Sequence, residues 1–143
     1  MIRSAGLEDL NKIELIEQEF GADAFTRRSL RHLILSDNIV YVIDLGGEIV
    51  GYLAALVRKD SPNIRLYSLM IDSRHRSRGY AVELIHFLER ESRASGRAQI
   101  SLEVREGNYP AVSLYTSCGF QMGEKLAGYY PDGESAIKFR KKI

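Results

Sequence analysis

The sequence predicts an α+β fold with a mixed β-sheet covered by helices, and three observations support this prediction. Apolar residues recur at helical spacing over residues 7–20, which indicates an amphipathic helix. Polar and apolar residues alternate over residues 99–104, as in a strand with one buried face. The pair Gly46-Gly47 separates two β-rich runs and therefore predicts a hairpin. Helices and strands interspersed in this way are typical of α+β proteins.

The remaining elements are predicted from caps, turns and periodicity. Thr26 is a candidate N-cap for a short second helix, and Gly96 fits the C-terminal end of a helix over residues 81–95. Glu89 belongs to the polar face of that helix and is expected to face water. A shorter helix, with a proline in its first turn, is expected over residues 108–118. The expected strands cover residues 39–44, 48–58, 64–71, 99–104, 120–126 and 135–141.

Length and composition restrict the class of protein. The 143 residues suit one domain, residues 1–143, with a substantial hydrophobic core. Apolar residues make up 45% and charged residues 27%, which excludes a disordered chain. The formal net charge of +1 predicts no general attraction to nucleic acid or to an anionic membrane. Every apolar run falls short of the roughly 20 residues that a membrane helix needs, so we expect no membrane partner.

The cysteine and histidine residues restrict the disulfides and metal sites that the chain can form. The single cysteine, Cys118, excludes an intramolecular disulfide and a cysteine-based metal cluster. It shares the apolar face of the helix over 108–118, so a core position is favoured over a nucleophilic one. The histidines His32, His75 and His86 are dispersed and predict no metal site. Acidic residues rather than a signal-peptide core follow the N-terminus, and we therefore expect a cytoplasmic protein.

The segment over residues 72–81 carries the strongest chemical signal, because it joins a predicted strand to a predicted helix. Unpaired amides at a helix N-terminus, together with a partial positive charge, bind phosphate. Gly79 permits close approach of a ligand, and small Ala81 leaves the helix start uncrowded. Three arginines in the segment add positive charge suited to phosphate. The alternative is a solvated, arginine-rich loop that only connects two elements.

Two motifs resemble those of the GNAT acetyltransferases. Residues 76–81 match that family's acetyl-CoA loop, Gln/Arg-x-x-Gly-x-Gly/Ala, and residues 108–120 match its Asn-x-x-Ala-x-x-Leu-Tyr-x-x-x-Gly-Phe signature. The resemblance covers nearly the whole chain. It implies a mostly antiparallel mixed sheet flanked by helices on both faces, acetyl-CoA as cosubstrate, and direct attack of a primary amine on the thioester. The sequence looks most similar to bacterial enzymes that acetylate the N-terminal alanine of a ribosomal protein, but residues 21–25 lack their usual Pro-Trp-Ser stretch.

Glu103 is the candidate general base. It lies on the polar side of the strand over 99–104, where a carboxylate can take a proton from an ammonium directly or through water. Many relatives carry a glutamate on the central strand instead, but residues 64–71 contain no carboxylate. The alternative is a strand-end glutamate paired with Arg105 or with an exposed lysine.

Tyr115 is the candidate general acid by resemblance, with its hydroxyl aimed at the CoA sulfur. A phenol suits this role because its reference pKa of about 10 lies near that of a thiol, about 8.5; the alternative is a core tyrosine. Asn108 is expected to cap a helix. The resemblance also implies that Asn108 contacts the pantetheine arm, although the cap alone would explain this residue, and that the backbone near Met70 and Ile71 binds the oxyanion. The residues expected to contact acetyl-CoA are Met70, Ile71, Arg76, Ser77, Arg78, Gly79, Tyr80, Ala81, Asn108 and Tyr115.

Tyr129 and Tyr130, beside a Pro-Asp-Gly turn, are candidates for the wall of the acceptor site, although exposed tyrosines are also common in such loops. The leading hypothesis is transfer of an acetyl group to the N-terminal amine of a protein or peptide. The alternatives are acetylation of a small amine, such as a polyamine, amino acid or aminoglycoside, and a non-catalytic acyl-CoA-binding protein. The expected partners are acetyl-CoA and the acceptor, without metal or nucleic acid, in a monomer or homodimer.

Overall fold

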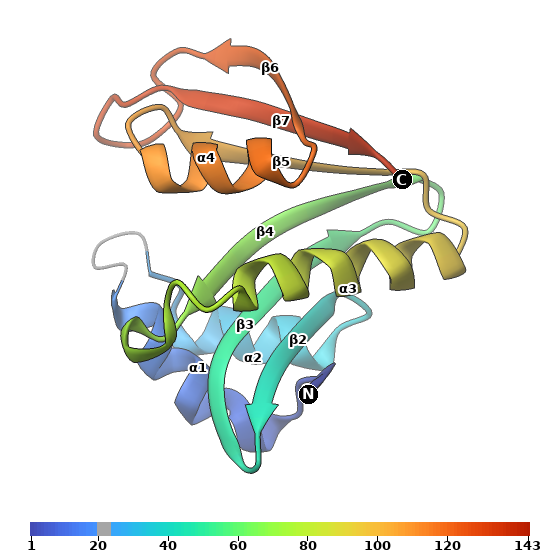
Figure 1. Ribbon diagram of the computed structural model, residues 1–143, viewed down its shortest axis with the longest axis vertical. Helices are drawn as coiled ribbons and strands as arrows, with labels where there is room; N and C mark the ends of the chain where they lie inside the picture. Colours follow the sequence, from blue (N-terminus) through green and yellow to red (C-terminus); the bar gives the residue numbers. More distant parts are fainter. Residues whose placement is uncertain (20–23) are drawn as a thin grey trace. The chain divides into compact units, whose positions relative to one another are not determined.

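The computed structural model describes residues 1–19 and 24–143 (Figure 1). The chain divides into two compact units. The N-terminal unit comprises residues 1–57 and 66–88, and the C-terminal unit comprises residues 58–65 and 89–143.

The first half of the chain supplies most of the N-terminal unit. Its elements are β1 (Ile2–Ser4), the 3-10 turn η1 (Leu7–Asp9), α1 (Leu10–Glu17), α2 (Arg27–Leu35), β2 (Ile39–Leu45) and β3 (Glu48–Val57). Two further elements, β4 (Asn63–Ile71) and α3 (Tyr80–Ala94), each contribute to both units, with the 3-10 turn η3 (Ser73–His75) between them. The C-terminal unit adds β5 (Gln99–Arg105), α4 (Tyr109–Ser117), β6 (Gln121–Leu126) and β7 (Ala136–Lys142).

The strands confirm the expected mixed, mostly antiparallel sheet. Among the described residues, seven strands follow the hydrogen-bonding order β1-β2-β3-β4-β5-β7-β6. The pairs β1–β2, β2–β3, β5–β7 and β6–β7 are antiparallel, whereas β4 and β5 are parallel. Strand β1 was not predicted from the sequence, because a strand of three residues is too short to show alternation.

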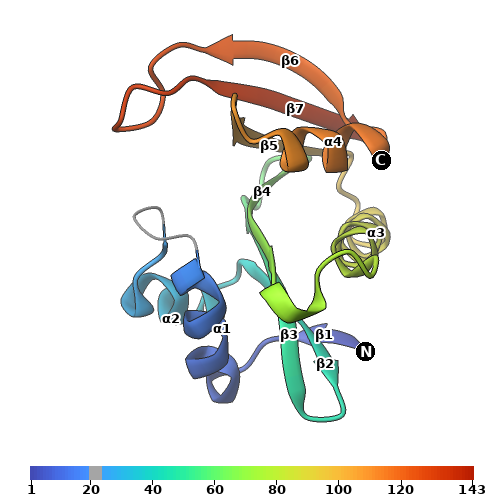
Figure 2. The same cartoon turned by 60° about the vertical axis from the view of Figure 1, so that its left-hand side comes forward.

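Helices cover both faces of the strands in the N-terminal unit, as expected. Figures 1 and 2 show α1 and α2 on one side of β2 and β3, with α3 on the other. The alternation along β2 explains the arrangement, because successive side chains of a strand point to opposite faces. Val40 and Val42 join the core beneath α1 and α2. Tyr41 points the other way, and its ring meets Phe87 of α3 edge-on at 4.8 Å.

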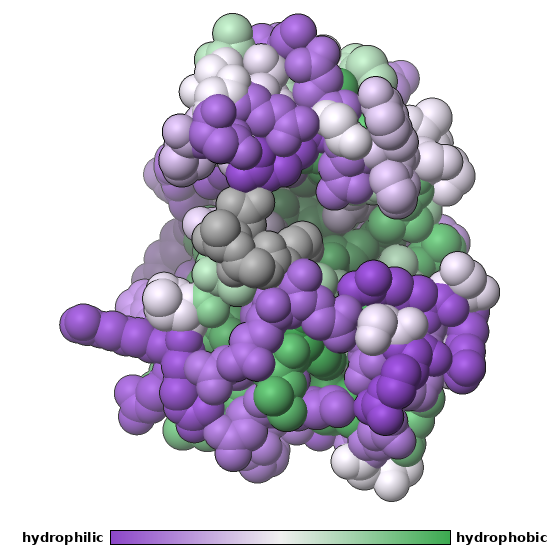
Figure 3. All heavy atoms as spheres, turned by 90° about the vertical axis from the view of Figure 1, so that its left-hand side faces the viewer, coloured by the Kyte–Doolittle hydropathy of each residue, from purple (hydrophilic) through white to green (hydrophobic). Residues whose placement is uncertain are grey.

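Polar side chains dominate the molecular face drawn in Figure 3, where a smaller apolar area is visible in the lower part. Several large apolar side chains are individually exposed, which is normal for a globular surface. Examples are Leu15, Leu35, Tyr67 and Met122. None of the helices in the described parts of the chain has the length and apolar character needed to span a bilayer.

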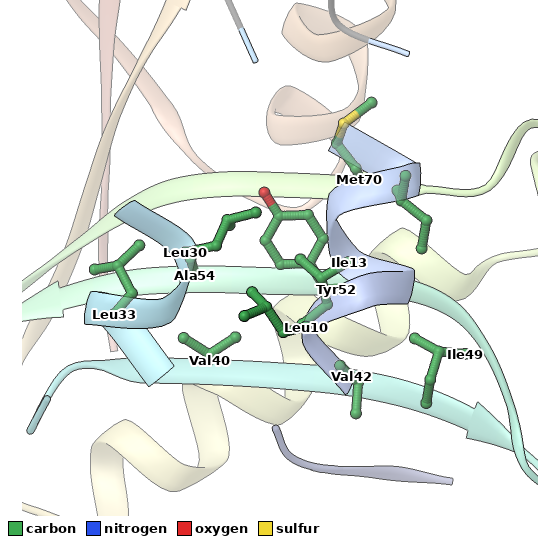
Figure 4. Close-up of a cluster of buried hydrophobic side chains, with 11 residues drawn as sticks. Leu10, Ile13, Leu30, Leu33, Val40, Val42, Ile49, Tyr52, Ala54 and Met70 are labelled. Carbon is green, nitrogen blue, oxygen red and sulfur yellow. The ribbon is translucent and has the colours of Figure 1, made fainter. Parts of the chain in front are cut away.

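The core of the N-terminal unit lies where α1 and α2 pack on β2 and β3. Figure 4 shows Tyr52 among side chains from both helices. Each fully buried Leu or Ile stabilises the fold by roughly 1.5–3 kcal/mol relative to an exposed one. The buried members of the cluster are Leu10, Ile13, Ile16, Leu30, Leu33, Val40, Val42, Ile49, Tyr52, Ala54 and Met70.

In the C-terminal unit, α4 contacts β7 through Tyr115, whose ring centroid lies 6.3 Å from that of Phe139. Along β5 the alternate residues Ile100, Leu102 and Val104 are buried, which confirms the strand pattern predicted from the sequence. The expectation that Glu89 faces water was wrong: the residue is only 4% exposed. Its Oε1 accepts a hydrogen bond from Lys141 Nζ at 2.7 Å, and this ion pair compensates the cost of burying the carboxylate.

Candidate functional site

The turn between β4 and α3 is held by Asp72. This residue caps η3, and its Oδ1 accepts a hydrogen bond from the backbone N–H of Arg74 at 2.9 Å. The Arg74 guanidinium also bonds Asp72 Oδ2 at 3.2 Å, and Lys12 Nζ lies 3.7 Å from the same oxygen. Hydrogen bonds from the Arg74 side chain, and then from its backbone, lower the pKa of Asp72 from 3.8 to about 2.

The backbone of the turn has the form that an anion-binding loop requires. Ser77 and Gly79 both have positive φ, 61° and 83°, and Ser77 is the only non-glycine residue with positive φ in the described chain. The first backbone bond at the start of α3 runs from Glu83 N–H to the Gly79 carbonyl at 3.1 Å. The amides just before Glu83 therefore have no intrahelical acceptor. Apart from Gly79 itself and its two chain neighbours, no heavy atom of the described residues lies within 4 Å of the position that a Cβ at Gly79 would occupy, so a ligand has room there.

The arginines of the turn differ in their contacts. Arg76 donates to the Ile71 carbonyl at 3.1 Å and forms an ion pair with Glu19 at 2.7 Å. Arg74 is engaged with Asp72, as described above. Arg78 is exposed, and within the part of the chain that the structure describes it has no hydrogen bond or ion pair. Arg78 is therefore the arginine of the turn with the greatest freedom to bind an anion.

Met70 and Ile71, expected to supply oxyanion donors, lie where β3 and β4 approach closely. Met70 is buried in the core, so its side chain is not accessible to a ligand. A Cβ at Gly51 of β3 would lie 3.0 Å from the Met70 carbonyl oxygen and 2.6 Å from Ile71 Cδ1. Glycine at position 51 thus permits this strand spacing. The oxyanion role stays a prediction.

A buried polar cluster in the N-terminal unit was missed by the sequence analysis. Glu17, at the end of α1, is 1% exposed and accepts hydrogen bonds from the hydroxyls of Tyr52 and Ser68, the latter at 3.0 Å. Its Oε2 accepts from the Phe25 N–H at 2.9 Å. Burial, followed by the charge of Glu17, raises the pKa of Tyr52. The burial of Glu17 could have been predicted from its position in the sequence, because Glu17 follows Ile13 by four residues and therefore shares the buried face of the helix.

In the C-terminal unit, Glu103 pairs with an arginine that the sequence analysis had not considered. Arg65 Nε donates to Glu103 Oε2 at 3.1 Å, and the Glu103 side chain is 14% exposed. In the described chain Glu103 thus pairs with Arg65 and not with Arg105, the alternative considered from the sequence. Arg105 instead forms ion pairs with Asp132 and Glu134, both at 2.9 Å.

The tyrosine pair lies close to both arginines. Tyr129 and Tyr130 meet edge-on, with ring centroids 5.1 Å apart. Arg65 Nη2 donates to the Tyr129 hydroxyl at 3.1 Å, and the Arg105 guanidinium lies 4.1 Å from the centre of the Tyr130 ring. The structure therefore brings Glu103 and Tyr129 together through Arg65.

Tyr115 is buried on α4, with Phe120 edge-on to its ring at a centroid distance of 5.5 Å. Burial raises the pKa of the Tyr115 phenol, and no described residue hydrogen-bonds its hydroxyl. The predicted helix cap is present, because Asn108 Oδ1 accepts from the Ala111 N–H at 3.2 Å. Cys118 is buried and burial raises its thiol pKa, in agreement with a core residue.

The predicted residues thus fall into two sets. The N-terminal unit holds Met70, Ile71 and the turn over residues 76–81, and the C-terminal unit holds Glu103 and the remaining candidates. The first set presents backbone donors for an anion, and the second combines a carboxylate, a protonated phenol and an aromatic pair. In the described parts of the chain, no group of three or more His, Cys, Asp or Glu side chains is placed to hold a metal ion.

The turn between β4 and α3 offers backbone donors suited to a phosphate group. The chain belongs to the acetyltransferase (GNAT) family, whose model matches residues 7–120. It is 31% identical over 144 residues to a Bacillus subtilis (strain 168) protein provisionally named a ribosomal protein bS18-alanine N-acetyltransferase, covering 95% of this chain and 91% of that one. The N-terminal acetyltransferase A complex catalytic subunit NAA10 of Arabidopsis thaliana is 33% identical over 119 residues, which cover 80% of this chain and 62% of that protein.

Solved structures agree with the family assignment. The ribosomal-protein-S18-alanine N-acetyltransferase from Escherichia coli superposes with a TM-score of 0.90 and 26% identity, covering 100% of this chain and 93% of that one. Ard1 from Thermoplasma volcanium has a TM-score of 0.87 at 23% identity, covers 100% and 97% of the two chains, and shares the fold.

The contacts of Asp72 predict a pH-dependent contribution to stability. Asp72→Ala removes the cap and should lower the free energy of unfolding by about 1 kcal/mol at pH 7. Because the folded-state pKa is depressed to about 2, this stabilisation is complete above the unfolded-state value near 4 and is lost as the pH falls toward 2.

Urea unfolding of wild type and Asp72→Ala from pH 7 to pH 2 measures the difference. The exposed Asp37, replaced by Ala, is the control and should show little effect at any pH. A difference that stays constant down to pH 2 would contradict the role given to the ionised Asp72.

Proposed function

We propose that the protein is an acetyl-CoA-dependent N-acetyltransferase whose acceptor is the N-terminal amine of a protein or peptide. The observation that carries this proposal is the nature of the relatives that match nearly the whole chain. The Bacillus and Escherichia coli proteins are both named for acetylation of the alanine of a ribosomal protein, and their similarity covers 95% and 100% of this chain. The single cysteine, Cys118, favours a reducing compartment, so we include the cytoplasm in the proposal.

The turn between β4 and α3 suits the pyrophosphate of acetyl-CoA. Ser77 and Gly79 bend the backbone with positive φ, and the first amides of α3 have no intrahelical acceptor. Arg78 adds an exposed cation without an internal partner among the described residues. When bound, acetyl-CoA supplies an activated acetyl group as a thioester, and the turn would hold its phosphates.

Glu103 is proposed to take the proton from the acceptor ammonium, directly or through a water. Its carboxylate is 14% exposed, and Arg65 engages one of its two oxygens. Neighbouring Tyr129 is 44% exposed, which suits an aromatic wall for an incoming peptide. A carboxylate beside such a wall can receive a proton from a positioned amine.

Tyr115 is proposed to donate a proton to the departing thiolate. Burial raises the pKa of the phenol, so the hydroxyl is protonated at neutral pH but is a weaker acid than an exposed phenol, whose pKa lies nearer that of a thiol. No described residue accepts a hydrogen bond from this hydroxyl, so its proton is not held in a hydrogen bond within the described chain. The proposed base, Glu103, and the proposed acid, Tyr115, are therefore two separate side chains of the C-terminal unit.

The proposal predicts turnover with peptides that have a free N-terminal amine. Release of CoA thiol should be measured with a peptide that begins with alanine or serine, with the same peptide blocked by N-terminal acetylation, and with spermidine. We expect turnover with the free peptide alone.

Turnover with spermidine and none with the peptides would assign a small-amine acetyltransferase instead. Binding of acetyl-CoA without turnover of any acceptor would favour the non-catalytic acyl-CoA-binding alternative.

The proposed acid–base roles predict a loss of kcat with little change in the KM for acetyl-CoA. Glu103→Gln and Tyr115→Phe should each lower kcat by about 10²-fold or more, the usual contribution of a general acid or base. Steady-state kinetics with acetyl-CoA and the preferred acceptor measures both constants.

Two substitutions nearby serve as controls. Glu106→Gln alters an exposed carboxylate just after β5, paired with Lys125 at 3.0 Å, and Tyr109→Phe alters a tyrosine of α4 that is 77% exposed. Both should keep wild-type kcat. An unchanged kcat in Glu103→Gln would refute the base, and a large rise in KM without loss of kcat in Tyr115→Phe would leave that residue only a binding role.

A further inference from the structure

Arg65 lies on β4 at the end of its pairing with β5. The parallel pairing of β4 with β5 comprises three residue pairs, and Arg65↔Ser101 is the last of them. Glu103 follows Ser101 by two residues, so the two side chains share one face of β5. The Arg65 side chain therefore lies beside the Glu103 carboxylate. This contact is not evident from the sequence, because the two residues are 38 positions apart.

The contact leaves one oxygen of the carboxylate available. Arg65 Nε binds Oε2 at 3.1 Å, and no described residue donates a hydrogen bond to Oε1. A charge-assisted hydrogen bond from a planar guanidinium restricts the orientation of a carboxylate. Arg65 thus fixes Glu103 by one oxygen and leaves the other for an amine or a water.

The same guanidinium reaches the tyrosine pair. Its Nη2 donates to the Tyr129 hydroxyl at 3.1 Å, while Nε is engaged with Glu103. Tyr129 in turn meets Tyr130 edge-on, and Tyr130 is packed beneath Arg105. Two different nitrogens of one side chain therefore link the carboxylate to the aromatic pair, which a lysine with its single nitrogen reproduces poorly.

The ion pair contributes little to folding stability. The Arg65 side chain is 40% exposed, and partly exposed ion pairs typically contribute only about 0–1 kcal/mol. Removal of Arg65 should therefore leave the fold intact, and its effect on turnover can be measured separately from unfolding.

We propose that Arg65 is a positioning residue that orients the Glu103 carboxylate relative to Tyr129, and so couples the seating of the acceptor to removal of its proton. The inference rests on the proposed function of Glu103 as general base. Arg65 itself exchanges no proton and acts through Glu103. Its loss should lower kcat for the acceptor without weakening acetyl-CoA binding.

A double-mutant cycle tests the proposal. The proteins compared are wild type, Arg65→Met, Glu103→Gln and the double variant, each assayed with the best acceptor of the wild type, whatever its chemical class. Arg65→Met should lower kcat about 10-fold in the wild-type background and less than about 2-fold in Glu103→Gln, because a positioning residue has nothing to orient once the carboxylate is gone. The KM for acetyl-CoA should be the same in all four proteins.

Further variants separate positioning from a structural role. Arg65→Lys keeps the charge and should recover part of the lost kcat, while Tyr129→Phe removes only the bonded hydroxyl and should raise the KM for the acceptor. Arg140→Met breaks a comparable ion pair between Arg140 of β7 and Glu124 of β6 and should change none of these constants. Thermal unfolding of every variant should stay within a few degrees of wild type.

The outcomes distinguish this inference from the proposed function. An equal loss in both backgrounds, no loss in either, or a rise in the KM for acetyl-CoA would overturn the role of Arg65 while leaving Glu103 as base. If Glu103→Gln itself keeps wild-type kcat, the proposed base is wrong and the role of Arg65 is overturned with it.

Discussion

The Asp72 turn and the Arg65 contacts both depend on β4, which has different neighbours along its length. Its first residues pair in parallel with β5 as far as Arg65, whereas its last residues lie against β3, where Gly51 permits close approach to Met70. One strand thus contributes to both compact units. The Arg65 contacts belong to the C-terminal unit, and the Asp72 turn follows β4 in the N-terminal unit.

Charge-assisted hydrogen bonds hold polar groups in place in both units. Asp72 ties the turn to Arg74, and the buried Glu17 collects donors from Tyr52, Ser68 and the Phe25 backbone. Such groups are costly to bury without partners, and each of them has partners. The consequence is a framework in which backbone donors and side chains are oriented before any ligand binds, as catalysis by positioning requires.

Local features of the sequence predicted local structure well. The turn over residues 76–81 was predictable because glycine and small residues leave a backbone signature, and the Asn108 cap because capping residues bond amides only a few positions away. The alternation along β5 was equally clear. By contrast, Glu89 was assigned to the surface because its partner, Lys141, lies 52 residues further along the chain. The Arg65–Glu103 pair was missed for the same reason, since periodicity carries no information on contacts between distant segments.

The site to which the acetyl group is transferred tests most directly whether the acceptor is an α-amine. A peptide with a free N-terminal alanine and one internal lysine should be incubated with the protein and acetyl-CoA, and the product should be mapped by fragmentation mass spectrometry. We expect a single acetyl group on the alanine nitrogen. Acetylation of the lysine side chain, with the N-terminus left free, would contradict an α-amine acceptor.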